Sequence, residues 1–373
     1  MKRVLFTAKV DSHIINFHIP YLKWFKEHGY EVHVASNGES SIPYADVKYN
    51  LDFDRNPLKP SNFKVYLRLK NLIDSNEYDI IHCHTPIGGA LARLAARDAR
   101  KKGTTVIYTA HGFHFLKGGS KASWIIFYPV EKFLSRYTDC LITINEEDYN
   151  LAKLKKFRAK DIRLVKGVGV DLERFTPALD DEKNSLREKL GYSAEEFIVI
   201  YIAELNSNKH QDLAINAINI IKNKIPNIKL LLVGDGVLKD EYKNQINTLN
   251  LNKNIEMLGH RKDVDDLLRL SNMAISTSRR EGLPRNIMEA MATGLPLVVT
   301  KCRGNSDLVK DNINGYEVNV DDSQELAEKI YTIYKDSELR VKFGNKSIEM
   351  VDDYSLKNVL KDMEHIYLSY ISK

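Results

Sequence analysis

Cysteine is scarce in this 373-residue chain, which contains only Cys83, Cys140 and Cys302. The three residues are far apart, and each lies in an apolar or strand-like neighbourhood. Their spacing fits neither a disulfide framework nor a zinc site. We therefore expect a protein of a reducing compartment, the cytoplasm.

Long apolar runs and a strong charge of one sign are also lacking. No run is long enough to cross a membrane, and the N-terminal segment lacks the apolar region and cleavage pattern of a signal peptide. Lys and Arg number 55 and Asp and Glu 50, a formal net charge of +5, which is too mild for a nucleic-acid binder. Basic residues do gather at 93–102 and 153–160, and we expect these segments near an anionic membrane surface or acceptor.

Several common catalytic motifs are absent. The loop after the first predicted strand, residues 7–12, has no G-x-G-x-x-G fingerprint, and Gly234-Asp235-Gly236 alone is weak evidence for a dinucleotide. The Walker A motif, the G-x-S-x-G elbow and the kinase signatures are missing as well. These absences disfavour hydride transfer and the commonest phosphotransfer and hydrolase chemistries.

Short apolar runs alternate with longer amphipathic segments along the chain, which predicts α/β domains with parallel sheets and helices on both faces. The predicted strands are 4–7, 31–35, 78–84, 105–109, 140–144, 197–202, 230–233, 255–259, 273–276, 297–300 and 315–318. The alternation pauses near 167–171, and the length also favours two domains. We predict Rossmann-like domains at 1–170 and 171–355, followed by a terminal amphipathic helix at 356–373.

The most informative segment carries Glu281 and Glu289, with seven residues between them across a predicted loop-to-helix junction. A Gly-Leu-Pro turn precedes the helix, so the backbone N–H groups of Arg285 and Asn286 point outward, where a diphosphate could bind. Pro284 suits the first helical position. The two carboxylates then border one anion-binding corner, where they suit sugar and ribose hydroxyls. The alternative is a surface helix with two solvated glutamates.

Two further residues follow predicted strands, at the edge where parallel sheets bind ligands. Lys209 follows the strand at 197–202, where its ammonium could neutralise a phosphate; the alternative is a surface lysine. His111 follows the strand at 105–109, and Gly112 permits a tight turn that projects the imidazole into a crevice. A packed, hydrogen-bonded histidine is the alternative.

Metal sites are considered and not predicted. His82 and His84 lie on one face of a strand, but the sequence shows no third ligand nearby with suitable spacing. The D-x-D patterns at 52–54 and 263–265 are common by chance in a chain this acidic. Neither is assigned to a metal.

Together these motifs resemble the retaining GT-B glycosyltransferases of family 4, in the family's order and over nearly the whole chain. The motifs are His111-Gly112, Gly-Val-Gly-Val-Asp at 167–171, Lys209, Gly234-Asp235-Gly236, Gly259-His260-Arg261, Glu281 with Glu289, and Asn314-Gly315. The segments His-Cys-His-Thr-Pro-Ile-Gly-Gly and Thr-Ala-His-Gly-Phe-His are similar to bacterial capsule, exopolysaccharide and O-antigen members. The resemblance implies two Rossmann-like domains facing across a cleft, with the C-terminal helix packing back on the N-terminal domain.

The resemblance also implies a reaction. A hexose or N-acetylhexosamine would move, with retention, from a UDP-sugar to a polyprenyl-diphosphate-linked saccharide, without a metal or other cofactor. The implied catalytic residues are His111, Glu281 and Lys209. The implied donor contacts are Glu289 for the ribose, Gly282, Leu283 and Pro284 with Glu281 for the sugar, Lys209 for the diphosphate, Arg285 and Asn286 at the helix start, and His260 and Arg261 for the nucleobase.

One position departs from the family pattern, because Glu204 stands where members commonly carry an arginine. Either Arg279, Arg280 or Arg285 supplies the missing positive charge, or Glu204 faces away and bonds to the acceptor or to the phosphate lysine. Two other functions stay open. A non-hydrolysing UDP-sugar 2-epimerase would need acid and base carboxylates but no acceptor, and a catalytically silent subunit would bind and activate a partner transferase.

An aromatic and basic segment predicts peripheral attachment to the inner face of the cell membrane. Its cations are Lys117, Lys121, Lys132 and Arg136, and its rings are Phe113, Phe115, Trp124, Phe127, Tyr128 and Phe133. Each cation near an anionic surface contributes around 1 kcal/mol, so binding would be reversible and salt-sensitive. The alternative is that the rings belong to the core of an ordinary helix.

Overall fold

The computed structural model describes residues 2–54, 56, 59–116 and 118–371, which form two compact units. The first unit comprises Met1–Val168 and Val359–Lys373, and the second comprises Gly169–Asn358. The structure thus divides the chain after residues 168 and 358. The boundaries predicted from the sequence were residues 170 and 355.

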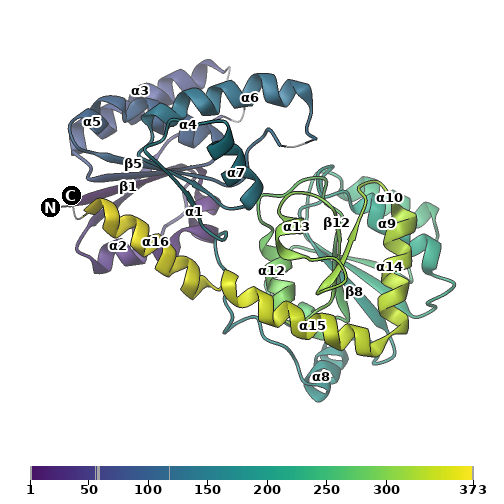
Figure 1. Cartoon of the computed structure of the whole chain (residues 1–373). Coiled ribbons are helices and arrows are strands. Elements are labelled where there is room, and N and C mark those ends of the chain that lie inside the picture. The colour runs from purple at the N-terminus through teal and green to yellow at the C-terminus, as the bar shows by residue number, and fades with distance from the viewer. Residues whose placement is uncertain (1, 55, 57–58, 117, 372–373) are drawn as a thin grey trace. The chain divides into compact units, whose positions relative to one another are not determined.

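The first unit contains a parallel sheet of seven strands in the order β3-β2-β1-β4-β5-β6-β7 (Figure 1). The strands are β1 (Arg3–Val10), β2 (Glu31–Asn37), β3 (Val47–Asn50), β4 (Ile80–His84), β5 (Thr105–Ala110), β6 (Cys140–Thr143) and β7 (Asp161–Leu164). The two edge strands, β3 and β7, were not predicted. Both are four residues long and alternate polar with apolar residues, so no apolar run marks them.

Helices cover both faces of this sheet. One face carries α3 (Pro60–Asn76), α4 (Pro86–Ala95), α5 (Arg97–Lys101), α6 (Lys121–Leu134) and α7 (Glu146–Leu154), and the other carries α1 (Asp11–Phe17), α2 (Ile19–Glu27) and α16 (Leu356–Ile371). A short 3-10 helix, η1 (Ser135–Tyr137), follows α6. Along β1, Leu5 joins one hydrophobic cluster, whereas Val4 and Phe6 join the other, as the two-residue period of a strand requires.

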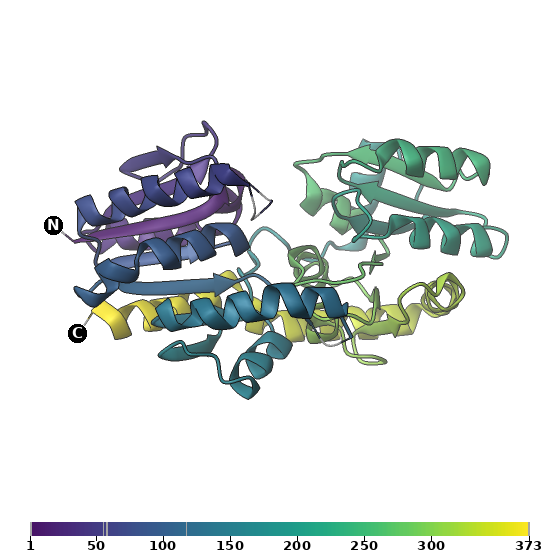
Figure 2. The ribbon, with the colours of Figure 1, turned by 90° about the horizontal axis from the view of Figure 1, so that it is seen from above.

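The C-terminal helix α16 packs on the first unit, as the resemblance implied (Figures 1 and 2). Trp24 Nε1 of α2 donates a hydrogen bond to Glu364 Oε1 at 3.2 Å. The hydroxyl of the buried Tyr367 lies 2.8 Å from His82 Nδ1 of β4. The last helix of the chain therefore completes the core of the unit with which the chain begins.

The second unit contains a parallel sheet of six strands in the order β10-β9-β8-β11-β12-β13. They are β8 (Phe197–Ile202), β9 (Ile228–Val233), β10 (Ile255–Gly259), β11 (Met273–Ser276), β12 (Leu297–Thr300) and β13 (Gly315–Val318). All six were predicted, and only β9 begins earlier than expected. Each sheet reverses its strand order once, between β1 and β4 and between β8 and β11, which is the Rossmann topology.

The helices of the second unit also cover both faces of its sheet. They are α8 (Asp180–Leu190), α9 (Gln211–Ile221), α10 (Lys239–Thr248), α11 (Val264–Leu270), α12 (Arg285–Ala292), α13 (Asn305–Leu308), α14 (Ser323–Lys335) and α15 (Ser337–Val351), with the 3-10 helix η2 (Asp352–Tyr354). Helices α9, α10 and α14 pack on the face that carries Phe197, Val199 and Tyr201. Helices α11 and α12 contact strands β8, β11 and β12.

The basic segments at 93–102 and 153–160 were expected at an anionic surface, and for Arg93 and Arg100 this is wrong. Arg93 is 1% exposed, and its NH2 lies 2.9 Å from Glu131 Oε2. Arg100 binds Asp139 with two hydrogen bonds, of 2.8 and 3.0 Å, and Lys160 Nζ lies 2.7 Å from the same carboxylate. Arg93 and Arg100 therefore neutralise acidic side chains within the fold, whereas the side chain of Lys160 stays 69% exposed.

All three cysteines are buried and free. Across the described residues, no helix combines the length and the apolar character that a membrane span requires.

Candidate active site

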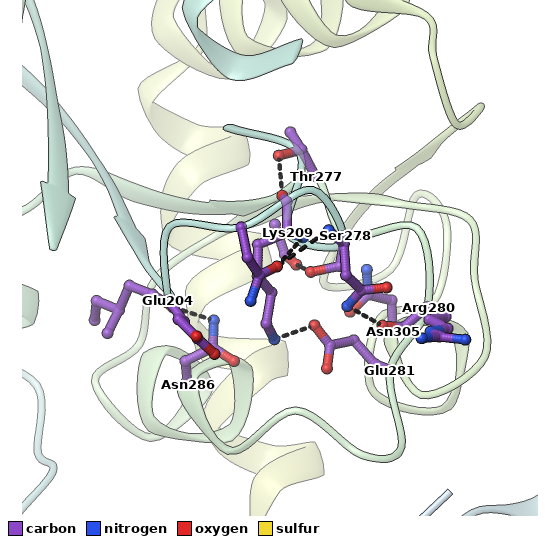
Figure 3. Close-up of polar contacts among 12 residues, drawn as sticks. Glu204, Lys209, Thr277, Ser278, Arg280, Glu281, Asn286 and Asn305 are labelled. Atoms are coloured by element: carbon purple, nitrogen blue, oxygen red, sulfur yellow. Dashed lines mark hydrogen bonds and ion pairs between the residues drawn. The ribbon is translucent and has the colours of Figure 1, made fainter. Parts of the chain in front are cut away.

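Lys209 and Glu281 point toward one another at the carboxyl ends of β8 and β11 (Figure 3). Lys209 Nζ lies 2.5 Å from Glu281 Oε1, and the two side chains are 21% and 11% exposed. Burial opposes the charge on Lys209, but the carboxylate of Glu281 outweighs it and the pKa of the ammonium is raised. The pair therefore places a stable positive charge where the strand order reverses, the position at which such sheets bind ligands.

Hydrogen bonds hold the two loops that carry this pair. Tyr201 OH and Thr277 Oγ1 both donate to the backbone carbonyl of Lys209, at 2.6 and 3.0 Å. Asn208 Nδ2 donates to the carbonyl of Arg280 at 3.1 Å and joins the loop after β8 to the loop after β11. Sequence reasoning missed these residues, because no motif marks a side chain whose partner is a distant carbonyl.

Helix α12 begins beside the Lys209–Glu281 pair, at Arg285. Pro284 was predicted as the first helical residue, but its ψ of 115° is extended, so it precedes the helix and its carbonyl accepts from Ile287 N–H at 3.2 Å. Asn286 Nδ2 donates to the carbonyl of Ile202 at 2.8 Å, which ties the helix start to the end of β8. The partial positive charge of the helix N-terminus thus lies at the same corner of the sheet.

Arg303 and Gly304, after β12, support the loop of Glu281. Arg303 is 8% exposed, and its Nε donates to the backbone carbonyl of Glu281 at 2.9 Å. Gly304 has a φ of 84°, and a Cβ there would lie 2.7 Å from the carbonyl oxygen of Gly282. Sequence reasoning did not identify either residue, although their place just after a strand was a usable signal.

Glu289 lies in the second turn of α12, as predicted, and is 9% exposed. Its Oε1 lies 2.9 Å from Arg285 Nε. Burial raises the pKa of the Glu289 carboxyl, while Arg285 and Arg174 act in the opposite direction. Glu281 and Glu289 are therefore held by different cations, and the alternative of two solvated glutamates is wrong.

Glu204 is exposed and lies in the loop after β8. It does not pair with Lys209, whose partner is Glu281. The Gly-Asp-Gly turn after β9 packs against this loop, because a Cβ on Gly234 would collide with the carbonyl of Ala203. These glycines thus permit a close backbone approach between two loops of the site.

The three arginines considered as substitutes for the missing family arginine differ in their partners. Arg279 NH2 lies 2.7 Å from Asp321 Oδ1, and Arg285 is paired with Glu289. Arg280 is exposed and forms no ion pair with any residue that the structure describes. Of the three, Arg280 alone keeps its guanidinium available to a bound anion.

His260 and Arg261 follow β10, near the opposite end of the sheet from β13. His260 is exposed, whereas Arg261 binds Asp263 through its Nε at 2.8 Å and through NH2 at 2.5 Å. Asp265 Oδ1 lies 2.7 Å from an NH2 of Arg174. Both carboxylates of the 263–265 pattern are thus bound by arginines.

In the first unit, His111 follows β5, and Gly112 has the predicted turn conformation with a φ of 117°. His84, at the end of β4, lies near it, with 3.4 Å between His84 Nδ1 and His111 Nε2. The argument that His84 has no further ligand nearby is wrong, because His13 and His18 join these two in one cluster. Those histidines come from α1 and its C-terminal end, which sequence spacing could not relate to β4.

Two family models match the chain. Residues 3–145 match the model described as "Glycosyl transferase 4-like", and residues 182–350 match "Glycosyl transferases group 1". A relative from Bacillus subtilis (strain 168) is named "Putative glycosyltransferase EpsD". It is 44% identical over 370 residues, which are 99% of this chain and 97% of that protein. The chain therefore belongs to the group 1, 4-like glycosyltransferases, and it is a glycosyltransferase.

A second relative is the Escherichia coli UDP-Gal:alpha-D-GlcNAc-diphosphoundecaprenol alpha-1,3-galactosyltransferase, 30% identical over 315 residues, with 83% of this chain and 80% of that protein covered. Among solved structures, Anabaena HepE in complex with UDP and glucose has a TM-score of 0.80 at 21% identity, covering 99% of this chain and 100% of that chain. This likeness shows that the fold is GT-B, as predicted.

We expect the effects of Lys209 and Glu281 on the free energy of unfolding to be coupled, because the two side chains form an ion pair. Lys209→Ala and Glu281→Ala should each lower the free energy of unfolding of the ligand-free protein by roughly 1–3 kcal/mol, since each leaves a mostly buried charge without its partner. The double variant should lose clearly less than the sum of the single losses. Urea unfolding measures all three, with Lys239→Ala, from an exposed pair with Asp235, as the matched control. Additive losses would contradict the pairing.

Proposed function

We propose that this glycosyltransferase moves a hexose or N-acetylhexosamine, with retention, from a UDP-sugar to a polyprenyl-diphosphate-linked saccharide in surface-polysaccharide biosynthesis in the cytoplasm. The observation that carries the proposal is the Lys209–Glu281 pair at the strand crossover of the second unit. The name of the Escherichia coli relative, with its UDP-galactose and diphosphoundecaprenol, supports these classes of donor and acceptor. The UDP and glucose held by HepE support a UDP-sugar donor.

In this proposal the corner between β8, β11 and α12 binds the diphosphate of the donor. Lys209 exchanges its contact with Glu281 for the phosphate oxygens, and the N-terminus of α12 adds its partial positive charge. Arg280, which is exposed, supplies the charge that Glu204 cannot. Preorganised positive groups of this kind stabilise the charge that develops on a leaving diphosphate.

The proposed reaction needs no carboxylate base. The bond between the anomeric carbon and the diphosphate oxygen breaks, and the acceptor hydroxyl forms its bond on the same face of the sugar. The hydroxyl proton passes to the departing phosphate oxygen, so the products are UDP and the extended saccharide. Glu281, released by Lys209, holds sugar hydroxyls beside the Gly282-Leu283-Pro284 turn, and His111 positions the donor sugar.

The remaining donor contacts are proposed along the same sheet edge. Glu289 accepts hydrogen bonds from the ribose hydroxyls, and the nucleobase stacks near His260 and Arg261. No metal or other cofactor takes part in the proposed step, because the cations of the protein neutralise the diphosphate.

UDP release from a panel of UDP-sugars, measured with and without a polyprenyl-diphosphate-linked saccharide, tests the proposal. We expect release that depends on the acceptor, survives EDTA and falls strongly in Lys209→Ala. Conversion of a UDP-sugar to its 2-epimer without acceptor would identify an epimerase instead. Donor binding with no turnover on any acceptor would favour a silent partner subunit, and rescue by Mg²⁺ or Mn²⁺ after EDTA would overturn the metal-free step.

Glu289→Ala should weaken UDP binding by roughly 1–3 kcal/mol, because the ribose hydroxyls lose their acceptor and a buried partner is left unmet. Isothermal titration calorimetry with UDP measures this loss. Glu241→Ala, at an exposed glutamate of α10, is the control and should bind UDP as the wild type does. Unchanged affinity in Glu289→Ala would remove this residue from the ribose site.

We also propose that the first unit attaches peripherally to an anionic membrane through α6. Four apolar residues of this helix are exposed, Ile125 at 73%, Ile126 at 56%, Val130 at 50% and Phe133 at 45%. Ile126, Val130 and Phe133 follow at helical spacing, so they share one face of α6. Basic side chains accompany them, at Lys121, Lys132 and Arg136. An apolar stripe beside cations suits the interface of an anionic bilayer.

This surface differs from the one expected from the sequence. Phe113 and Phe115 are 3% and 0% exposed and belong to the core. Trp124, Phe127 and Tyr128 are half-buried against the same core. Of the six rings named, only Phe133 is well exposed, and Lys117 lies outside the described residues. The isoleucines, which the ring-centred reasoning overlooked, carry the exposed apolar area.

Flotation with lipid vesicles tests the membrane proposal. Binding to anionic vesicles should fall at high salt, in Lys121→Glu, and in Ile126→Ser with Val130→Ser, because each change removes a charge or an apolar contact. Val237→Ser with Val341→Ser, at exposed apolar positions of the second unit, should bind as the wild type does. Equal recovery with neutral vesicles, or no flotation, would contradict attachment to an anionic surface.

A further inference from the structure

Four histidines meet at the strand crossover of the first unit. His13 lies in α1, His18 directly after it, His84 ends β4 and His111 follows β5. One ring nitrogen from each lies within 4.8 Å of the other three. Strands β1, β4 and β5 are neighbours in the sheet, so the loops after them meet at its ligand-binding edge.

The shortest separations in the cluster are those of metal ligands. His13 Nε2 lies 3.3 Å from His111 Nε2, and His111 Nε2 lies 3.4 Å from His84 Nδ1. Four nitrogens placed about 2.0–2.1 Å from a tetrahedral Zn²⁺ are about 3.3–3.4 Å from one another. A hydrogen on His111 Nε2 could point at only one of its two neighbours, whereas a metal ion would bind all three nitrogens.

Two of the histidines have ring nitrogens without a partner. His18 is 1% exposed, and neither of its ring nitrogens has a hydrogen-bond partner among the described residues. The fully buried His84 also has an unpartnered nitrogen, Nε2, but its Nδ1 is the nitrogen that faces His111. A buried polar group left unsatisfied costs roughly 1–3 kcal/mol. A cavity of about 10 Å³ lies beside the cluster; His18, His84 and His111 are among its lining residues, as is His82, whereas His13 is not. The cluster thus offers the unpartnered nitrogens of His18 next to a cavity of the size of a single small ion.

His82 shows what a satisfied histidine looks like in the same core. Its Nδ1 and Nε2 lie 2.8 Å from Tyr367 OH and from Thr109 Oγ1. It is not part of the cluster, although it precedes His84 on the same strand face, with 4.1 Å between the ring centroids. His82 is therefore satisfied where His18 is not. His33, outside the cluster, also has a ring nitrogen without a hydrogen bond, but that nitrogen, Nε2, lies 3.1 Å from Glu31 Oε1.

Burial favours the neutral form of the imidazoles in the cluster. Burial lowers the pKa of His13 to about 4 and holds the pKa of His18, His84 and His111 well below the ordinary value. Neutral imidazole is the form that binds metal ions, and nitrogen ligands suit zinc, cobalt, nickel and copper, whereas magnesium and calcium require oxygen.

We propose that His13, His18, His84 and His111 bind one divalent transition-metal ion, of which Zn²⁺ is the ordinary biological example. The longer separations, up to 4.8 Å, close by rotation of the rings on binding. His13 and His111 are only half-buried, so the ion reaches the site from their side.

Bound metal would occupy the ring nitrogen of His111. If His111 positions the donor sugar, as the proposed function holds, the ion inhibits sugar transfer and its removal by EDTA relieves inhibition. This consequence rests on the proposed function, but the metal site does not.

Titration of the full-length, EDTA-treated protein with Co²⁺ tests the site without any activity measurement. We expect the visible absorption band of tetrahedral Co²⁺ to saturate near one equivalent and to disappear when Zn²⁺ displaces the cobalt. Zn²⁺ should also raise the melting temperature of the protein, because it binds only the folded cluster. Octahedral Co²⁺ spectra, or binding without saturation near one equivalent, would overturn the proposal.

Three variants show whether the metal binds to the cluster or to other histidines of the protein. His18→Phe keeps the ring volume and removes two unpartnered nitrogens, so it should fold and lose both the band and the Zn²⁺-induced rise in melting temperature. His13→Gln, at a half-buried position, should weaken Co²⁺ binding at least tenfold. His28→Phe, at an exposed histidine directly after α2, should behave as the wild type does. A band of equal intensity in His18→Phe and His13→Gln would assign the metal to the surface and overturn the proposal.

Discussion

The chemistry of this protein depends on one constraint, that strands of a parallel sheet all end at the same edge. The loops after β8 and β11 can meet only because these strands are neighbours, although 70 residues lie between the end of β8 at Ile202 and the start of β11 at Met273. The reversal of strand order at this pair leaves a gap between the helices that cover the two faces. Lys209 and Glu281 occupy that place, and the hydrogen bonds of Tyr201, Thr277 and Asn208 hold their loops there.

The two units share the same sheet topology, but different kinds of side chain lie at the strand crossover of each unit. In the second unit, the crossover holds a lysine and a glutamate that compensate one another, so a mostly buried charge is retained. In the first unit, the crossover holds neutral histidines whose nitrogens are partly unpartnered. In the proposed function an anionic ligand replaces Glu281 as the partner of Lys209, whereas in the proposed metal site an ion satisfies nitrogens of the histidine cluster.

Burial also separates basic residues with a structural role from those available to a partner. Arg93 and Arg100 stand in a basic stretch of sequence, yet both are bound to carboxylates of the same unit. The exposed face of α6 carries isoleucine and valine, which an inspection for rings and cations passes over. A count of charges or aromatic residues along the sequence therefore predicts neither the ion pairs of Arg93 and Arg100 nor the exposed apolar face of α6.

The fold could be predicted from the sequence alone because its signal is local. Apolar runs marked every strand of the second unit, and only the short edge strands β3 and β7 lacked such a run. The ends of the predicted strands also placed the candidate residues on the correct elements, because Gly112, Lys209 and the Gly-Leu-Pro turn each follow a strand. Only Pro284 was misplaced, by one position, since it precedes the helix α12.

Tertiary structure alone decided which side chains meet. Lys209 pairs with Glu281 rather than with Glu204, and Arg303 reaches the Glu281 loop from beyond β12. His13 and His18 joined His84 and His111 only because the sheet places β1 beside β4 and β4 beside β5. Each of these contacts joins segments that are far apart in the sequence, because the order of the strands or the burial of a charge brings them together. The local spacing of residues does not predict such contacts.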